Sequence, residues 1–232
     1  MIVWLASFPR SGNTFLRILL SRLYGVRSST VYDVDGVARR LGERFVGYEE
    51  RSASYAATRA SSTVHFVKTH RQRDLDVEEG DRAICLVRDG RDSLVSWARM
   101  MSEDEPSQFE ARLREIVERD TPTGTGGWGA NVLSWMRPAA GHRMVLRYDD
   151  LIADPVRSVT EAMTALLPEI QPIEGGEAPD FAALRERDAL FFRRGIVGSH
   201  RDELPDELHE LFWSRPGNAA AMALLGYGDP RT

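Results

Sequence analysis

The chain has 232 residues, with 30 basic and 35 acidic side chains, a formal net charge of −5 and a pI near 5.6. Its composition, 42% hydrophobic and 28% charged, is that of an ordinary globular protein and excludes a disordered, collagen-like or coiled-coil chain. At about 100–200 residues per domain, the length predicts a single domain over residues 1–232. A slightly acidic chain is a poor general binder of polyanions, so we expect no nucleic-acid partner.

The cysteine count and the N-terminal stretch indicate the compartment. Cys85 is the one cysteine in the sequence, which excludes a disulfide framework and a zinc site of the Cys/His type. The apolar N-terminal residues are interrupted by Arg10, Arg17 and Arg22 and are followed by no cleavage pattern. We therefore expect a cytoplasmic protein with neither a leader nor a membrane anchor.

Short apolar runs alternate with helical patterns along the chain. Residues 2–6 predict a strand that ends in a polar turn, and residues 14–24 have apolar side chains at helical spacing up to Gly25. Further strands are predicted at residues 64–67, 83–87 and 143–147, and further helices at 93 onward, from a capping box at 107–110 to about 119, from 154–155, and over most of the chain beyond 178. This alternation predicts an α/β fold with a three-layer parallel sheet flanked by helices.

Two loops between these elements have compositions suited to ligand binding. Residues 121–129 are rich in glycine and either close over a ligand or connect two helices. Residues 8–14 resemble a phosphate-binding loop, because consecutive backbone N–H groups lead into a helix N-terminus. The loop is not a Walker A sequence, since Ser7 stands where that motif needs glycine and Asn13 where it needs lysine.

Five ordered segments are similar to the motifs of one enzyme family. The segments are FPRSGNTF at 8–15, VKTH at 67–70, VRDGRDSLVSW at 87–97 with Arg88 and Ser96 eight residues apart, RYDDLIADP at 147–155 and FFRRGIVG at 191–198. Together they resemble the sulfotransferases that use 3′-phosphoadenosine 5′-phosphosulfate (PAPS), with the P-loop-like fold of the cytosolic sulfotransferases. The resemblance covers nearly the whole chain and implies transfer of a sulfuryl group from PAPS to a hydroxyl, with 3′-phosphoadenosine 5′-phosphate (PAP) as the other product.

The resemblance also implies a role for each matching residue. The catalytic positions are His70 as general base, Lys68 as support for the transferring sulfuryl group, and Arg10, where the family has a lysine that contacts the bridging oxygen. The 5′-phosphosulfate would be bound by Ser11, Gly12, Asn13 and Thr14, and the adenine would pack near Phe15 and Tyr148. The 3′-phosphate would be held by Arg88, Ser96, Arg193, Arg194 and Gly195.

The basic residues support this assignment independently. Lys68 is the only lysine among the 30 basic residues, and it falls inside the catalytic segment. A chain that otherwise uses arginine retains an ammonium where a compact charge that can lose its proton is useful. A sulfuryl group carries less negative charge than a γ-phosphate, so we expect no metal requirement.

The acceptor and the assembly are less constrained by the sequence. Pro9, Phe45, Tyr48, Met100 and Met101 either line an apolar acceptor pocket or belong to the core, and we expect a small-molecule alcohol or phenol. Residues 201–210 lack the family's dimer motif, so the oligomeric state stays open. Two alternatives also stay open, a P-loop kinase or ATPase and a non-catalytic nucleotide-binding protein.

Overall fold

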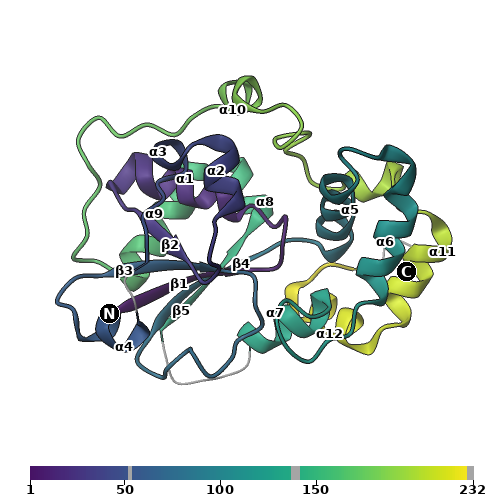
Figure 1. Cartoon of the computed structure of the whole chain (residues 1–232), viewed down its shortest axis with the longest axis horizontal. Helices are drawn as coiled ribbons and strands as arrows, with labels where there is room; N and C mark the ends of the chain where they lie inside the picture. The colour runs from purple at the N-terminus through teal and green to yellow at the C-terminus, as the bar shows by residue number, and fades with distance from the viewer. Residues whose placement is uncertain (52–53, 137–141, 229–232) are drawn as a thin grey trace.

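The computed structural model describes residues 1–51, 54–136 and 142–228 (Figure 1). Its centre is a parallel sheet of five strands in the order β2-β3-β1-β4-β5. The strands are β1 (Ile2–Ser7), β2 (Ser28–Thr30), β3 (His65–Thr69), β4 (Arg82–Val87) and β5 (Arg143–Arg147). The predicted parallel α/β architecture is therefore confirmed.

Helices cover both faces of the sheet and form a layer beside it. The helices in the first half of the chain are α1 (Asn13–Tyr24), α2 (Gly36–Leu41), α3 (Glu43–Val46), α4 (Tyr55–Ala60), α5 (Gly90–Met101) and α6 (Phe109–Glu118). Those in the second half are α7 (Trp128–Met136), α8 (Tyr148–Ala153), α9 (Pro155–Leu166), α10 (Phe181–Arg187), α11 (Asp206–Ser214) and α12 (Pro216–Leu225). Two 3₁₀ turns, Pro106–Gln108 and Ser199–Asp202, precede α6 and α11.

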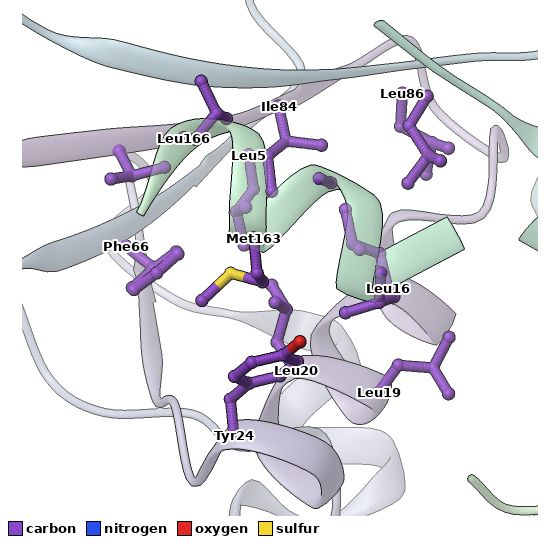
Figure 2. Close-up of a cluster of buried hydrophobic side chains, with 14 of the residues drawn as sticks. Leu5, Leu16, Leu19, Leu20, Tyr24, Phe66, Ile84, Leu86, Met163 and Leu166 are labelled. Atoms are coloured by element: carbon purple, nitrogen blue, oxygen red, sulfur yellow. The ribbon is translucent and has the colours of Figure 1, made fainter. Parts of the chain in front are cut away.

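One face of the sheet is buried by α1 and α9. Alternate side chains of a strand point to opposite faces, and Val3 and Leu5 of β1 pack on this side with Phe66 of β3. Figure 2 shows the cluster, in which Leu16 and Met163 come from the two helices. The cluster fixes the start of α1, and with it the loop that joins β1 to α1.

The opposite face of the sheet packs on different elements. Trp4 and Ala6 of β1 lie there with Trp135 of α7, and Tyr55 of α4 packs against this cluster. A further cluster joins α5, α6, α7, α11 and α12 into the helical layer seen at the right of Figure 1. The chain after α9 runs through α10, which packs on α1 and α2, before it enters this layer (Figure 1). Residues 188–198, the crossing segment, follow α10 and accept hydrogen bonds from Arg10 at the Phe191 carbonyl and from Arg88 at the Ile196 carbonyl.

Two local predictions need correction, and one strand was not predicted. The strand predicted at 64–67 runs from His65 to Thr69 and so contains Lys68. The short strand β2 was not predicted, because Ser28, Ser29 and Thr30 carry no apolar signal. The predicted capping box is wrong: residues 106–108 form a 3₁₀ turn, and Gln108 precedes α6 without a side-chain cap. The N-cap predicted at Asp154 is confirmed, since its carboxylate accepts from the Arg157 N–H at 3.1 Å.

Across the described residues, no helix combines the length and the apolar character needed to cross a membrane.

Candidate active site

The loop between β1 and α1 is fixed by hydrogen bonds to the end of β1. Gly12 precedes the helix at φ 100° and gives it no side-chain cap, which leaves the first N–H groups of α1 for a ligand. The Asn13 amide donates inward to the Leu5 carbonyl at 2.9 Å and to the Ser7 hydroxyl at 3.1 Å. A Cβ at Gly12 would lie 2.7 Å from the Tyr148 ring. The loop therefore offers backbone N–H groups at a position where only glycine fits.

Ser11 differs from the other predicted loop residues. Its side chain is buried with the hydroxyl 3.4 Å from that of Ser93, and its N–H donates to the Phe8 carbonyl at 3.4 Å. Ser11 is also absent from the cavity wall described below. The structure thus gives Ser11 a role inside the turn, and the prediction that it binds the phosphosulfate gains no support.

Lys68 lies near the end of β3, with its side chain almost fully buried. The ammonium lies 4.8 Å from the centroid of the Tyr32 ring, a cation–π distance. Burial lowers the pKa of Lys68 to about 8, and the nearby carboxylate of Asp35 partly offsets this effect. Lys68 therefore carries a charge at neutral pH that is lost only about one unit above it.

His70 follows β3 directly and faces the end of β1. The pairing of Ala6 with Thr69 brings the next residues, Ser7 and His70, together. The Nδ1 of His70 lies 2.9 Å from the Ser7 carbonyl oxygen. A carbonyl can only accept, so Nδ1 carries the proton and the neutral ring keeps its lone pair on Nε2. The backbone N–H of His70 donates to the Tyr32 hydroxyl at 3.1 Å, which fixes the residue from a second side.

Two effects hold His70 neutral. Burial lowers its pKa well below 6.5, and the charge on Lys68 lowers it further. The group is therefore an unprotonated base at physiological pH. No hydrogen bond within the described part of the chain reaches its Nε2, and the side chain is part of the cavity wall.

Arg88 lies at the start of the β4–α5 turn and joins the loop to the crossing segment. Its guanidinium donates to the carbonyl oxygens of Arg10 at 3.1 Å and Ile196 at 3.0 Å, and it lies 4.2 Å from the centroid of the Tyr148 ring. Its Nε is buried and has no partner in the described structure. A buried donor left unpaired costs free energy unless a ligand accepts from it, which suits an anionic ligand at this point.

Asp92 on α5 orders the same region. Its carboxylate accepts from the backbone N–H groups of Gly198 at 2.8 Å and His200 at 2.9 Å, and it lies 3.6 Å from the Arg88 guanidinium. The imidazole of His200 adds a bond of 2.7 Å. Burial opposes the charge, but these donors bring the pKa of Asp92 down to about 2. The carboxylate is thus a permanent anchor for Arg88 and the crossing segment.

Arg193 and Arg194 are held by carboxylates that follow them. Glu203 accepts from Arg193 at 2.6 Å and from Arg194 at 3.2 Å, and Asp202 accepts from Arg194 at 3.1 Å. Gly195 comes next with φ 63°, which turns the chain back toward α5. Both arginines are therefore tied to the 3₁₀ turn that follows them and its next residue.

Arg10 is the one non-glycine residue with positive φ, 63°, among those the structure describes. Its Nε donates to the Ser96 hydroxyl at 3.2 Å and its Nη2 to the Phe191 carbonyl at 2.7 Å, while Nη1 lies 3.7 Å from the Met100 sulfur. The guanidinium also stacks on the Phe191 ring at 4.3 Å. All three nitrogens thus contact α5 and the crossing segment.

These side chains converge on one cavity of about 680 Å³, the main cavity. Of the predicted site residues, those in its wall are Arg10, Gly12, Asn13, Thr14, Phe15, Lys68, His70, Arg88, Ser96, Tyr148, Arg193, Arg194 and Gly195. The loop at 121–127 contributes Thr125, and its Gly124 carbonyl accepts from the Gln72 N–H at 2.7 Å. The glycine-rich loop therefore borders the cavity as well as connecting two helices.

The acceptor residues suggested by the sequence are only partly in this wall. Pro9 and Met100 line the main cavity, whereas Phe45 packs in the core cluster beneath α2 and α3. Tyr48 forms a bridge with Ser28 at the edge of the sheet. Phe45 and Tyr48 therefore belong to the packing of the fold and do not line the main cavity.

Sequence reasoning missed several residues that shape the site. Tyr32 contacts both Lys68 and His70, and Asp35 forms a fully buried ion pair with Arg17 at 2.6 Å. Tyr32 follows a strand that has no apolar signal, so nothing in the local pattern marked it. Asp35 had one usable signal in the sequence, because aspartate is a preferred N-cap residue. In the structure its carboxylate accepts from two N–H groups of α2.

The comparisons with known proteins agree with this geometry. Residues 2–166 match the sulfotransferase domain family, and the chain belongs to this family. It is 28% identical over 157 residues to WSCD family member GA21586 of Drosophila pseudoobscura pseudoobscura, covering 66% of this chain and 46% of that protein. It is 23% identical over 234 residues to Sulfotransferase 1E1 of Rattus norvegicus, covering 89% and 79%.

A solved structure shares the fold. Mouse sulfotransferase SULT7A1, crystallised with PAP, superposes with a TM-score of 0.61 at 17% identity over 98% of this chain and 89% of that one. The chain spans about half the length of the WSCD family relatives that it matches. The family and the fold expected from the five segments are thus confirmed.

Proposed function

We propose that this protein transfers the sulfuryl group of PAPS to the hydroxyl of a small-molecule alcohol or phenol, with His70 as general base. The observation that carries the proposal is the state of His70: a neutral imidazole whose Nδ1–H is held by the Ser7 carbonyl, with Nε2 free at the wall of the main cavity. The sulfotransferase domain match supports the reaction class, and the PAP bound to SULT7A1 supports the donor.

The residues of the cavity suit the two anionic ends of PAPS. The start of α1 presents N–H groups at the loop, and Arg88, whose buried Nε has no partner among the described residues, donates to the Arg10 carbonyl of the same loop. We assign the 5′-phosphosulfate to the loop through Gly12 and Thr14, and the 3′-phosphate to the wall formed by Arg88, Ser96 and the 193–195 segment. Phe15 and Tyr148 provide the aromatic surface for adenine.

The reaction then needs little from the protein beyond position and charge. Nε2 of His70 takes the proton of the acceptor hydroxyl as the acceptor oxygen bonds to sulfur, and the bond between sulfur and the bridging oxygen breaks to release PAP. Negative charge develops on the sulfuryl and phosphate oxygens, and fixed cations and N–H groups stabilise it. Lys68, on β3 two residues before His70, is the cation we assign to the sulfuryl oxygens. A metal is not required by this scheme, and residues 1–51, 54–136 and 142–228 contain no group of three or more ligating side chains that could hold one.

The main cavity has more apolar than polar lining, including Val37 and Trp97, which favours a largely apolar acceptor. The one cysteine, Cys85, is buried and free, in keeping with a reducing cytoplasm. We also propose that residues 1–232 form a single domain.

Calorimetric binding of PAP, adenosine 5′-phosphate and magnesium ATP tests the function. We expect PAP to bind without metal and more tightly than adenosine 5′-phosphate, because only PAP has the 3′-phosphate that we assign to Arg88, Ser96 and the 193–195 segment. A preference for magnesium ATP would instead favour the kinase or ATPase alternative. Binding of PAP without transfer to any of a panel of alcohols and phenols would favour the non-catalytic alternative.

The pH dependence of transfer tests Lys68. Because burial lowers its pKa to about 8, the ammonium is present at pH 7 and is lost as the pH rises through about 8. We expect kcat/KM to fall on this alkaline side. Because the pKa of His70 is well below 6.5, kcat/KM should not change between pH 7 and pH 6.5. A Lys68→Arg protein retains its charge, so its alkaline fall should disappear. An unchanged alkaline fall in this variant would assign the titration to another group.

A further inference from the structure

The backbone of His70 is held by side chains from two other parts of the fold. The paired residues of β3 end with Thr69 opposite β1 and Lys68 opposite β2, so His70 is the first residue beyond the sheet. Its N–H and C=O groups then need partners from elsewhere. The Tyr32 hydroxyl accepts from the N–H at 3.1 Å, and the Asn131 side-chain amide donates to the C=O at 2.9 Å. Two side chains thus take the place of the sheet at this residue.

Asn131 lies on α7 with its side chain buried, and its amide joins two segments of the site. The nitrogen donates to the His70 carbonyl and to the Thr125 carbonyl of the glycine-rich loop, each at 2.9 Å. A carbonyl only accepts, so both bonds need N–H donors, and an asparagine amide supplies two from one atom. His70 and Thr125 line the main cavity, whereas Asn131 does not. Asn131 therefore acts on the site through these two residues.

One face of α7 holds the chain that follows His70. Asn131, Ser134 and Trp135 are three and four residues apart, so they lie on the same side of the helix. The Trp135 indole donates to the Arg71 carbonyl at 2.9 Å, and the Ser134 hydroxyl accepts from the Arg73 N–H at 3.0 Å. The helix is thus docked along residues 70–73, and Asn131 makes the contact that reaches the proposed base.

We propose that Asn131 is a positioning residue for His70, which fixes the base and the glycine-rich loop in one arrangement. This rests on the proposed function, since His70 is the base of that reaction. A general base works only within hydrogen-bond reach of the acceptor hydroxyl, and a displacement of about 1 Å can lower the rate about 10²-fold. Without Asn131, the His70 carbonyl loses its donor, and the link to Thr125 is lost with it. Because Asn131 lies outside the cavity wall, its contribution belongs to kcat and not to nucleotide binding.

The test replaces Asn131 with alanine in two backgrounds. In the unmodified protein, kcat at saturating PAPS is expected to fall about 10- to 100-fold, while the affinity for PAP, measured by calorimetry, changes less than about threefold. In a His70→Ala protein, the same change should lower the remaining rate by less than about threefold, because Asn131 acts through the imidazole.

Asn218→Ala is the matched control. Asn218 is a buried asparagine of α12 that also bonds to α7, since its side-chain oxygen accepts from the Gly129 N–H at 2.9 Å. Its amide nitrogen donates to the Phe212 carbonyl at 3.1 Å, and it does not line the main cavity. We expect this variant to lose stability in urea unfolding and to keep its kcat.

The pKa of His70, followed by NMR, gives a second readout that does not depend on turnover. Burial and the charge of Lys68 hold this pKa well below 6.5. An imidazole released from its place gains contact with water, which favours its charged form. Asn131→Ala should therefore raise the pKa of His70 toward 6.5, whereas Asn218→Ala should leave it unchanged.

Three results overturn the proposal. They are an unchanged kcat in Asn131→Ala, a fall in kcat matched by Asn218→Ala or by an equal loss of PAP affinity, and a fall of the same size in the His70→Ala background. If His70→Ala is too slow for this comparison, the NMR readout decides, and a pKa of His70 that does not rise overturns the proposal.

Two further provisions keep the test decisive. Asn131→Leu, which fills most of the same volume without donors, is measured in parallel in case Asn131→Ala does not fold, and the same results overturn the proposal there. If the unmodified protein transfers no sulfuryl group to any alcohol or phenol, the proposed function itself fails. The pKa of His70 in the Asn131 variants then shows separately whether Asn131 holds this residue in place.

Discussion

Replacing His70 with alanine is expected to lower kcat by about 10²–10⁴-fold, the usual contribution of a general base, and to leave PAP binding nearly unchanged. The side chain faces the cavity through Nε2, and its only hydrogen bonds within the described structure run through Nδ1 to Ser7. None of the contacts of Arg88, Arg193 or Arg194 involves it. Loss of the imidazole would therefore remove the proposed proton acceptor and leave the contacts of these three arginines in place.

The measurement pairs calorimetry of PAP with the transfer rate at saturating PAPS. His65→Ala is the matched control, because His65 begins the same strand and bonds through Nε2 to the Thr63 hydroxyl at 2.8 Å, away from the cavity. We expect this control to transfer normally. Turnover that survives in His70→Ala would remove His70 from the mechanism, and loss of PAP binding would show that its role is structural.

Replacing Asp35 with asparagine is expected to reduce the free energy of unfolding by about 3–5 kcal/mol, the usual cost of removing one partner of a buried ion pair. The side chains of Arg17 and Asp35 are 0% and 1% exposed, so the guanidinium would be left as an unpaired charge in the interior. Asparagine caps helices as well as aspartate does, and the start of α2 should be retained. Asp35 also raises the pKa of Lys68, so the variant should lower that pKa further.

Urea unfolding of three proteins checks this result. The double change Arg17→Met with Asp35→Asn removes both charges and should recover part of the loss, because no charge stays buried without a partner. The control is Glu115→Gln, at an exposed pair on α6, with an expected change below about 0.5 kcal/mol. A single variant as stable as the control would show that the buried pair contributes nothing.

Most of the fold was predictable because its signals are local. The apolar runs that became β1 and β4 are buried between helices on both faces of the sheet, and the run at β5 forms an edge strand. Gly25 ends α1 in a left-handed cap, as its place in the sequence indicates. Strand β2 has three small polar residues, held by pairing with β3, so its formation depends on a neighbour distant in sequence. The capping box at 107–110 failed because Pro106 favours a 3₁₀ turn one step earlier.

The site also combines residues that local motifs predict with contacts between residues distant in sequence. The loop, Lys68 and His70 are contiguous motifs, and the strand register alone brings the latter two beside β1. Compensation of charge could not be predicted, because Glu203 lies 104 residues from Arg99 and Asp92 lies 108 from His200. Which arginines are free for a ligand is therefore a property of tertiary contacts, and the arginine-rich composition hides it.

The single lysine gives the protein an intrinsic chemical reporter. The sequence has one ε-amino group, and it belongs to the wall of the main cavity with a pKa of about 8. Near that pH a large share of the group is the uncharged amine, the form that acylating reagents attack, whereas the arginines stay protonated. Acylation of lysine would therefore be confined to the main cavity, and the extent of modification would record how much of the cavity is occupied.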